Sequence, residues 1–284
     1  MFDFRYHALT LVAVFLALMV GLLLGVAIGD RGLVSSAEHD LRDSLRADVR
    51  RSRAQSAGLR SQLLQQRRIQ QAVYPLLVEG RLSGQRVGLI GLGSLPDSTI
   101  RRTRAALTNT GGRLTAVTVI REPVPSAAIP GQGPSATAPN PATLRRFGAD
   151  VGMSFVSGGS LIRQIQRSLL VSSSGQLTGM TAVVLYRAAR DENAPEAAGT
   201  NAFEQGLVNG LTSGGTQVVG VESSTTAPSQ IRWFNDRRLA SVDNLDQPVG
   251  EAALVFTLAG ANGAYGIKDT AQALLPNAAG GPRR

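Results

Sequence analysis

The sequence predicts an α/β protein carried on a membrane anchor, and three observations lead to this fold class. The chain of 284 residues opens with a long apolar run, continues with a polar stretch of helical pattern, and from Gln85 alternates short apolar runs with amphipathic segments. We therefore expect an N-terminal transmembrane helix, a long coiled-coil stalk helix, and a mostly parallel sheet covered by helices. The corresponding segments are 1–30, 31–80 and 81–276, followed by a disordered tail over 277–284.

The anchor is predicted from residues 8–28, an unbroken run of apolar and small residues. A helix needs about 20 such residues to cross the hydrocarbon core of a bilayer. A cleavable signal peptide is the alternative, with Ala27, Ile28 and Gly29 as its cut site, but its apolar core spans only about 7 to 15 residues. Because this run is longer, we expect a retained, single-pass anchor.

Small residues recur at every fourth position of the anchor and so share one helix face: Ala13, Ala17, Gly21, Gly25 and Gly29. In lipid, helices associate through close backbone approach, which small residues permit. This anchor-packing stripe predicts a homo-oligomer. The alternative is that glycine and alanine are simply common in membrane helices.

The stalk is predicted as one long polar helix over 35–78 with a thin apolar seam, formed by Leu45, Val49, Leu59, Leu63, Val73 and Leu77. Alternating steps of three and four residues keep such a seam facing a partner helix in a coiled coil. Polar residues such as Ser52 and Gln66 interrupt the seam, so the coiled coil should be weak by itself. Pairing of the anchors would raise the effective concentration of the two stalks.

The chain has a formal net charge of +9, and unbalanced arginines crowd the second half of the stalk. No aromatic residue lies among these arginines, and they do not share one face of the helix. We therefore expect a solvated rod and no nucleic-acid partner.

The α/β domain is predicted from near-continuous apolar strands over 86–92, 113–120, 182–186, 217–221 and 252–258, with helices over 97–110, 161–171 and 201–212. Such strands, separated by helices, indicate a parallel sheet covered on both faces. The first helix should be capped by Asp97 or Ser98. Six prolines among small polar residues over 121–141 predict an exposed, mobile insertion.

The sequence supports neither a dinucleotide-binding site nor a hydrolytic triad in the domain. Gly91 and Gly93 invite a dinucleotide site, but Pro96 occupies the position of the third glycine, so a tight strand-to-helix turn is expected. The chain has no cysteine, and its two histidines, His7 and His39, precede the domain, which excludes a Ser-His-acid triad within it. We expect no enzyme activity and name no catalytic, cofactor-binding or metal-binding residue.

Two further pairs in the domain receive structural interpretations. The acidic pair at 191–192 reads as solvated loop charge before Pro195. Trp233 and Phe234 read as a core or interface plug rather than a substrate platform.

Three segments together resemble the actinobacterial MctB-like family, usually called copper transporters. They are the membrane start over 5–18 with Gly21 and Gly25, the stretch SVDNLDQPVG over 241–250 with the apolar run that follows it, and Gly263–Gly266. Relatives tend to carry histidine near this last segment, where this chain has Ala264. The resemblance implies an envelope protein, described as pore-forming, in copper efflux or homeostasis. Other relatives resemble partners of cell-separation machinery.

The sequence contains no recognisable copper-binding motif. Cu(I) prefers thiolate, thioether and imidazole ligands. The candidate ligands lie far apart in the sequence: His7, Met19, His39, Met153 and Met180. Copper is thus implied by the resemblance alone, and no cofactor is identifiable. Copper homeostasis through oligomeric assembly is the first expectation. The second is a structural scaffold that docks a cell-wall or cell-separation partner, and the third a cytoplasmic nucleotide or lipid sensor.

Flanking charge and family resemblance disagree about topology. Arg31, Arg42 and Arg46 follow the span while Arg5 alone precedes it, so the positive-inside rule places the stalk in the cytoplasm. Long domains, however, translocate largely regardless of flanking charge. With the resemblance, we expect the α/β domain outside the cytoplasm.

Overall fold

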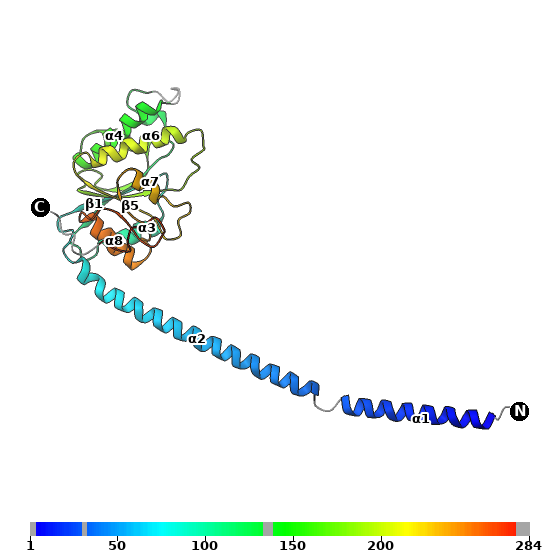
Figure 1. Ribbon diagram of the computed structural model, residues 1–284. Helices are drawn as coiled ribbons and strands as arrows, with labels where there is room; N and C mark the ends of the chain where they lie inside the picture. Colours follow the sequence, from blue (N-terminus) through cyan, green and yellow to red (C-terminus); the bar gives the residue numbers. More distant parts are fainter. Residues whose placement is uncertain (1–3, 30–32, 133–138, 277–284) are drawn as a thin grey trace. The chain divides into compact units, whose positions relative to one another are not determined.

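The computed structural model describes residues 4–29, 33–132 and 139–276 (Figure 1). The chain divides into two compact units, Met1–Arg68 and Ile69–Arg284, which we describe separately. The predicted tail over 277–284 lies outside the described residues.

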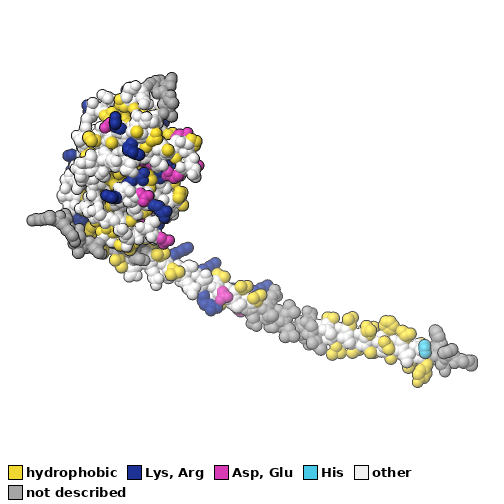
Figure 2. Space-filling view, turned by 45° about the horizontal axis from the view of Figure 1, so that its top comes forward, with side chains coloured by type: hydrophobic (Ala, Val, Ile, Leu, Met, Phe, Trp, Pro, Cys, Tyr) yellow, Lys and Arg dark blue, Asp and Glu magenta, His cyan; other side chains and the backbone are white. Residues whose placement is uncertain are grey.

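The first unit contains helix α1 (Phe4–Gly29) and most of helix α2 (Leu33–Val78). Within α1, Tyr6–Ala27 is long and apolar enough to cross a membrane, with a mean hydropathy of 2.8. Figure 2 shows hydrophobic side chains along α1, and none of this stretch is buried within the chain. The predicted N-terminal apolar helix is confirmed.

Helix α2 continues without a break through most of the predicted stalk segment. Short-range ion pairs, Arg46 with Asp43 and Arg51 with Asp48, lie on its exposed surface. Such exposed pairs contribute little to stability. The single helix is as expected, and its pairing into a coiled coil stays a prediction. At its C-terminal end, Tyr74 donates a hydrogen bond to the carbonyl oxygen of Ala106, 2.9 Å away, within the second unit.

The second unit is built on a sheet that has seven strands within the described residues: β1 (Arg86–Leu92), β2 (Arg113–Ile120), β3 (Leu170–Gly175), β4 (Ala182–Arg187), β5 (Gln217–Val221), β6 (Ala240–Val242) and β7 (Ala264–Tyr265). The spatial order is β3-β2-β1-β4-β5-β6-β7. All neighbouring pairs are parallel except β2 and β3. The predicted, mostly parallel sheet is confirmed.

Helices cover both faces of this sheet (Figure 1). On one face lie α4 (Pro141–Ser157), α5 (Leu161–Leu169), α6 (Ala197–Thr212) and α7 (Ile231–Asp236). Apolar side chains of these helices, such as Phe155 of α4 and Phe203 of α6, form a core with apolar side chains of the sheet. On the other face lie α3 (Asp97–Ala106) and α8 (Pro248–Leu258), around a second core that includes Leu89 and Leu254. Successive side chains of the central strands point to opposite faces of the sheet, so each strand contributes to both cores.

Helices α4 and α6 contact each other through glycines. A Cβ atom at Gly148 would overlap the carbonyl oxygen of Phe203, and one at Gly206 would overlap that of Arg145. Gly152 and Gly210 are as tightly enclosed by the facing backbone. The two helix backbones therefore touch directly, and only glycine fits at these positions.

Several details of the predicted domain are wrong. The helix predicted over 161–171 ends at Leu169, because the chain from Leu170 pairs with β2 as strand β3. The helix predicted over 97–110 ends at Ala106. Residues 252–258 lie in α8, not in a strand, because a short, fully apolar run does not by itself distinguish a buried helix from a buried strand. Neither Asp97 nor Ser98 caps helix α3: the residue before the helix is Pro96, whose backbone is extended, and no side chain caps the helix. The proline-rich insertion is packed in its first part, where a short helix η1 (Ser126–Ala128) leads to the buried Ile129; residues 133–138 lie outside the description.

Candidate functional site at the carboxyl edge of the sheet

Charged side chains follow four parallel strands at the points where these strands end. Glu122 lies two residues beyond β2, Arg187 is the last residue of β4, Glu222 follows β5, and Asp243 follows β6. Parallel strands that are neighbours in a sheet end along the same edge, which is where α/β proteins place their binding sites. This edge is therefore the first place to look for function.

Strands β1 and β4 mark the point at which the chain changes direction across the sheet. From β1 the chain proceeds to β2 and β3 on one side, whereas β4 to β7 extend on the other. Ligands of open α/β sheets bind outside the strand ends at such a switch point. Here Gly93, with a φ of 78°, turns the chain after β1, and Ala188 follows β4 with its N–H donating to Leu92, 3.1 Å away.

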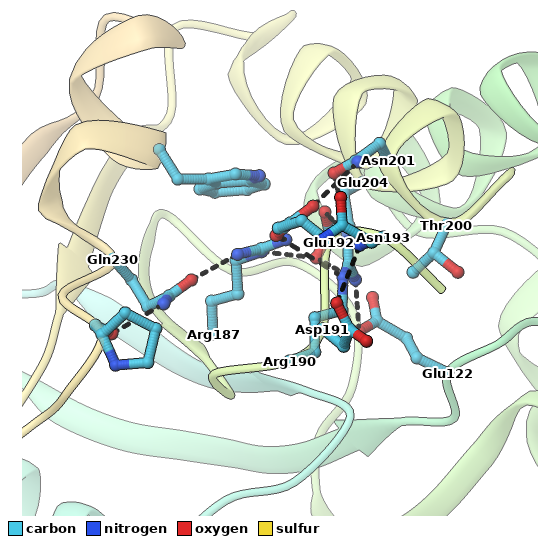
Figure 3. Close-up of polar contacts among 12 residues, drawn as sticks. Glu122, Arg187, Arg190, Asp191, Glu192, Asn193, Thr200, Asn201, Glu204 and Gln230 are labelled. Atoms are coloured by element: carbon cyan, nitrogen blue, oxygen red, sulfur yellow. Dashed lines mark hydrogen bonds and ion pairs between the residues drawn. The ribbon is translucent and has the colours of Figure 1, made fainter. Parts of the chain in front are cut away.

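Arg187 is the centre of a buried polar cluster, with a side chain only 2% exposed. Its Nε donates to Glu204 Oε1 at 2.8 Å, and its Nη2 donates to Glu192 Oε1 at 2.6 Å. Its Nη1 donates to the side-chain oxygen of Gln230. Figure 3 shows this guanidinium between Gln230 on one side and the carboxylates of α6 and the preceding loop on the other.

The guanidinium of Arg190 also binds the carboxylate of Glu204. Its Nη2 lies 2.8 Å from Glu204 Oε2 and also donates to Asn201, while its Nη1 lies 3.2 Å from Glu122 Oε2. Helix α6 thus supplies the central acid, while the end of β4 and the loop after it supply the cations. We call Glu122, Arg187, Arg190, Glu192 and Glu204 the edge cluster.

Burial and the neighbouring charges shift the pKa values of Glu122 and Arg187 in the edge cluster. Burial, and then repulsion from Glu204, raise the pKa of Glu122 to about 8, although Arg190 and Arg187 oppose the shift. Burial alone would lower the pKa of Arg187, but Glu204 and Glu192 outweigh it and raise that pKa. At neutral pH Glu122 therefore keeps its proton while Arg187 stays charged.

Trp233 of α7 covers the cluster. Its ring lies 4.9 Å from the guanidinium carbon of Arg187 and 3.9 Å from that of Arg237, within the range of cation–π attraction. The adjacent Phe234 is fully buried in the core. Of the pair predicted as a plug, Phe234 fills the core and Trp233 closes the polar site.

A second branch of polar contacts continues along the edge from Gln230. The backbone N–H of Gln230 donates to Glu222 Oε2 at 2.6 Å, and Lys268, the single lysine of the sequence, lies 2.5 Å from Glu222 Oε1. Asp243 accepts hydrogen bonds from the N–H groups of Ile267 and Lys268. This branch fixes the C-terminal segment against the sheet.

A cavity of about 320 Å³ opens beside Glu122 at the switch point. Its walls come from the turn after β1, the end of β2, the loop after β4 and the start of α6: Gly93, Ser94, Glu122, Pro123, Ala188, Ala189, Arg190, Asp191, Ala194, Glu196, Ala197 and Thr200. The volume falls at the lower end of the range of about 300–1,000 Å³ found for ligand pockets.

The edge cluster is a poor place for copper. Its donor atoms are carboxylate oxygens held by arginines, whereas copper favours sulfur and imidazole. In the part of the chain that the structure describes, no three histidine, cysteine, aspartate or glutamate residues are grouped so that they could hold a metal ion. The donor atoms of the edge cluster therefore do not fit copper.

The residues predicted for assembly all lie in helices. The anchor-packing stripe falls on α1, where a Cβ at Gly21 or Gly25 would meet open space. The six seam residues fall on α2 with exposures between 39% and 62%. These surfaces are exposed and could contact a second copy of the chain. That a second copy covers them stays a prediction.

Sequence reasoning missed most of the edge cluster. The acidic pair at 191–192 is exposed, as predicted, but Glu192 also binds Arg187 and Asn201, which was not predicted. Arg187 extends the predicted strand 182–186 by one residue, so an arginine at the end of a buried strand was the available signal. Glu204, in the middle of an amphipathic helix, gave none.

These features define a class: an α/β protein with one N-terminal helix apolar enough to span a membrane and an ion-paired cluster at the carboxyl edge of its sheet. The sequence matches the family described as "Copper transport outer membrane protein, MctB" over residues 1–129 and 142–276. The chain therefore belongs to the MctB family, which confirms the resemblance noted in its sequence. No curated protein matches the chain.

Proposed function

We propose that this chain is a single-pass envelope protein that serves copper homeostasis by assembling with further copies of itself. The family match carries the proposal, because it includes the apolar helix as well as the α/β domain. Copper is the cargo in this proposal and not a cofactor. The protein acts without catalysis, in keeping with a sequence that has no cysteine and no histidine beyond His39.

The exposed seam of α2 supports assembly. Apolar side chains such as Leu59 and Leu63 are more than half exposed on a helix that is otherwise polar. Burying apolar surface yields about 25 cal/mol per Å², so a second copy that covers the seam stabilises both. The small-residue stripe of α1 supports association in the membrane in the same way.

The test is a deletion strain complemented with variants of the seam. We expect the deletion to raise cell-associated copper and lower copper tolerance, and the wild-type gene to reverse both effects. The double substitution Leu59→Asp and Leu63→Asp places charge on the seam and should fail to restore tolerance. A matched control, Ser61→Asp with Gln65→Asp, adds the same charge off the seam and should restore it.

A scaffold that docks a cell-wall or cell-separation partner is the second candidate. It is favoured by the lack of a metal-holding group within the described residues and by the chemistry of the edge cluster. Unchanged copper content and tolerance in the deletion strain, together with misshapen or chained cells, would contradict the copper function and support the scaffold.

We further propose that the α/β domain lies outside the cytoplasm. Because the chain lacks cysteine, Ser174→Cys on the exposed edge strand β3 creates a single thiol. A membrane-impermeant maleimide should label this thiol in intact cells. Labelling only after lysis would place the domain in the cytoplasm.

A further inference from the structure

A second cavity, of about 420 Å³, opens beside helix α3 at the carboxyl edge of the sheet. Its walls come from α3 and from the segments that follow β5 and β6: Ser98, Thr99, Arg101, Arg102, Ala105, Ser223, Leu245 and Asp246. Thr99 and Leu245 are buried and form its floor, whereas both arginines are exposed. Open α/β sheets bind ligands outside the carboxyl ends of their strands, so this α3 cavity lies where a ligand is expected.

The hydroxyl group of Thr99 has no hydrogen-bond partner within the described residues. Thr99 is only 8% exposed, and it lines the α3 cavity. Polar groups that are buried to this extent are nearly always hydrogen-bonded in native proteins. The unpaired hydroxyl group therefore points to a ligand in the cavity that supplies its partner.

The α3 side of the cavity carries a positive charge that no carboxylate balances. Among the described residues, the Arg101 guanidinium forms no ion pair, whereas Arg102 Nη1 lies 3.1 Å from Glu251 Oε1 of α8. Ser98 belongs to the first turn of α3, where the helix dipole favours an anion, and the exposed Asp97 of the same turn does not line the cavity. Guanidinium groups bind phosphate oxygens through paired hydrogen bonds, and hydroxyl groups add further donors. This side therefore fits a phosphate group.

The walls that follow β5 and β6 offer a hydrogen-bond acceptor. Asp246 accepts hydrogen bonds from the N–H and from the hydroxyl group of Ser224, both at 2.7 Å. Burial alone would raise the pKa of Asp246, but the hydrogen bonds from Ser224 outweigh it and lower that pKa. A carboxylate fixed in this way repels a phosphate group and accepts hydrogen bonds from hydroxyl groups. The ligand that fits both walls has a phosphate group at one end and hydroxyl groups at the other.

We propose that the α3 cavity binds a phosphate monoester of a polyol, such as a sugar phosphate. The phosphate group lies against Arg101 and Thr99, and hydroxyl groups of the polyol donate to Asp246. Two guanidinium groups line the cavity against one carboxylate, which favours a ligand of net negative charge over a zwitterion such as a free amino acid. This inference does not depend on the role of the protein in copper homeostasis.

The test measures binding to the full chain in detergent micelles by isothermal titration calorimetry. The probes are glycerol 3-phosphate, D-ribose 5-phosphate and D-glucose 6-phosphate, and at least one of them should bind with a dissociation constant of about 1 mM or lower. Inorganic phosphate lacks the polyol, and D-glucose lacks the phosphate group. Each should bind about tenfold more weakly than the best probe, or not at all.

Variants of α3 tie the binding to this cavity. Thr99→Val removes only the hydroxyl group and should weaken the best probe about tenfold. Its thermal midpoint should stay at or above that of wild type, because the lost hydroxyl group has no partner in the fold. Arg101→Gln should also weaken binding about tenfold, whereas Arg104→Gln, at an exposed position of α3 outside the cavity, should leave it unchanged. Ala105→Leu fills the cavity from an exposed helical position and should abolish binding.

Failure of all three probes to bind would overturn the proposal. Equal binding of D-glucose and D-glucose 6-phosphate, equal affinities of Arg101→Gln and Arg104→Gln, or full binding by Ala105→Leu would overturn it as well. Tighter binding of L-serine than of any phosphate probe would show that the ligand is a zwitterion and not a phosphate ester.

Discussion

At the scale of single residues, the edge cluster shows how a buried charge is retained. Arg187 has almost no contact with solvent, and removing a charge from water is costly unless partners compensate it. Here Glu204, Glu192 and the Gln230 side chain take up its donors. Removing one partner leaves the other charges unpaired, so Glu204→Ala should destabilise the fold more than loss of an exposed ion pair.

The raised pKa of Glu122 predicts how stability depends on pH. Between its ordinary value of 4.5 and about 8, the folded chain holds a proton that the unfolded chain releases. Stability therefore falls as the pH rises through this window, by at most roughly 1.4 kcal/mol per pH unit from this group. The lowered pKa of Glu192 acts below the window and does not reverse the trend.

The check is the thermal midpoint of the full chain in detergent at pH 5.5 and pH 8, followed by circular dichroism. Glu122→Gln cannot titrate, so its midpoint should fall less between the two pH values than that of wild type. Glu79→Gln serves as the control and should retain the wild-type difference. An unchanged difference in Glu122→Gln would contradict the assignment of the proton to this carboxyl group.

At the scale of elements, the contact between α4 and α6 depends on four glycines. Gly206→Ala would drive a methyl group into the backbone of α4, and overpacking of this kind costs about 1–3 kcal/mol. We expect a lower thermal midpoint with the helical content retained at low temperature. In the control Gly214→Ala, the added methyl group would meet Val156 at an ordinary contact distance, and the midpoint should stay close to that of wild type. Equal midpoints for the two variants would show that the helices can separate at little cost.

Several elements were predictable because their pattern has one interpretation. The strands at 86–92, 113–120 and 217–221 have the bounds expected from continuous β-branched and aliphatic runs. The run at 252–258 has two interpretations, and Pro248 at the first turn of α8 was the signal that decides for a helix. Strand β3 was missed because Ser172 to Ser174 carry no apolar pattern, and it forms only by pairing with β2 at the sheet edge.

The site was less predictable than the fold for a physical reason. Its members come from the segment after β2, the end of β4, the loop that follows β4, and α6, and they meet only after the sheet has formed. Glu204 looks like a solvated helix charge until Arg187 and Arg190 are placed over it. A linear pattern carries no information about such contacts, whereas it does carry the order of strands and helices.

At the scale of the whole molecule, the proposed functions fall on different units. The anchor-packing stripe and the seam residues from Leu45 to Leu63 lie in the first unit, while the edge cluster and the cavity belong to the unit that begins at Ile69, together with the last seam residues Val73 and Leu77. The substitutions Leu59→Asp and Leu63→Asp, which lie in the first unit, should therefore leave the fold of the second unit intact.

The most direct test of the account is to recover the protein from cells and determine where it is found, where it starts and how many copies associate. We predict that it is found in the membrane fraction with its first 29 residues intact, and that sedimentation equilibrium in detergent gives two or more copies per particle. Recovery of a soluble monomer that begins near Asp30 would contradict the account, because neither the anchor nor the assembly built on it would exist.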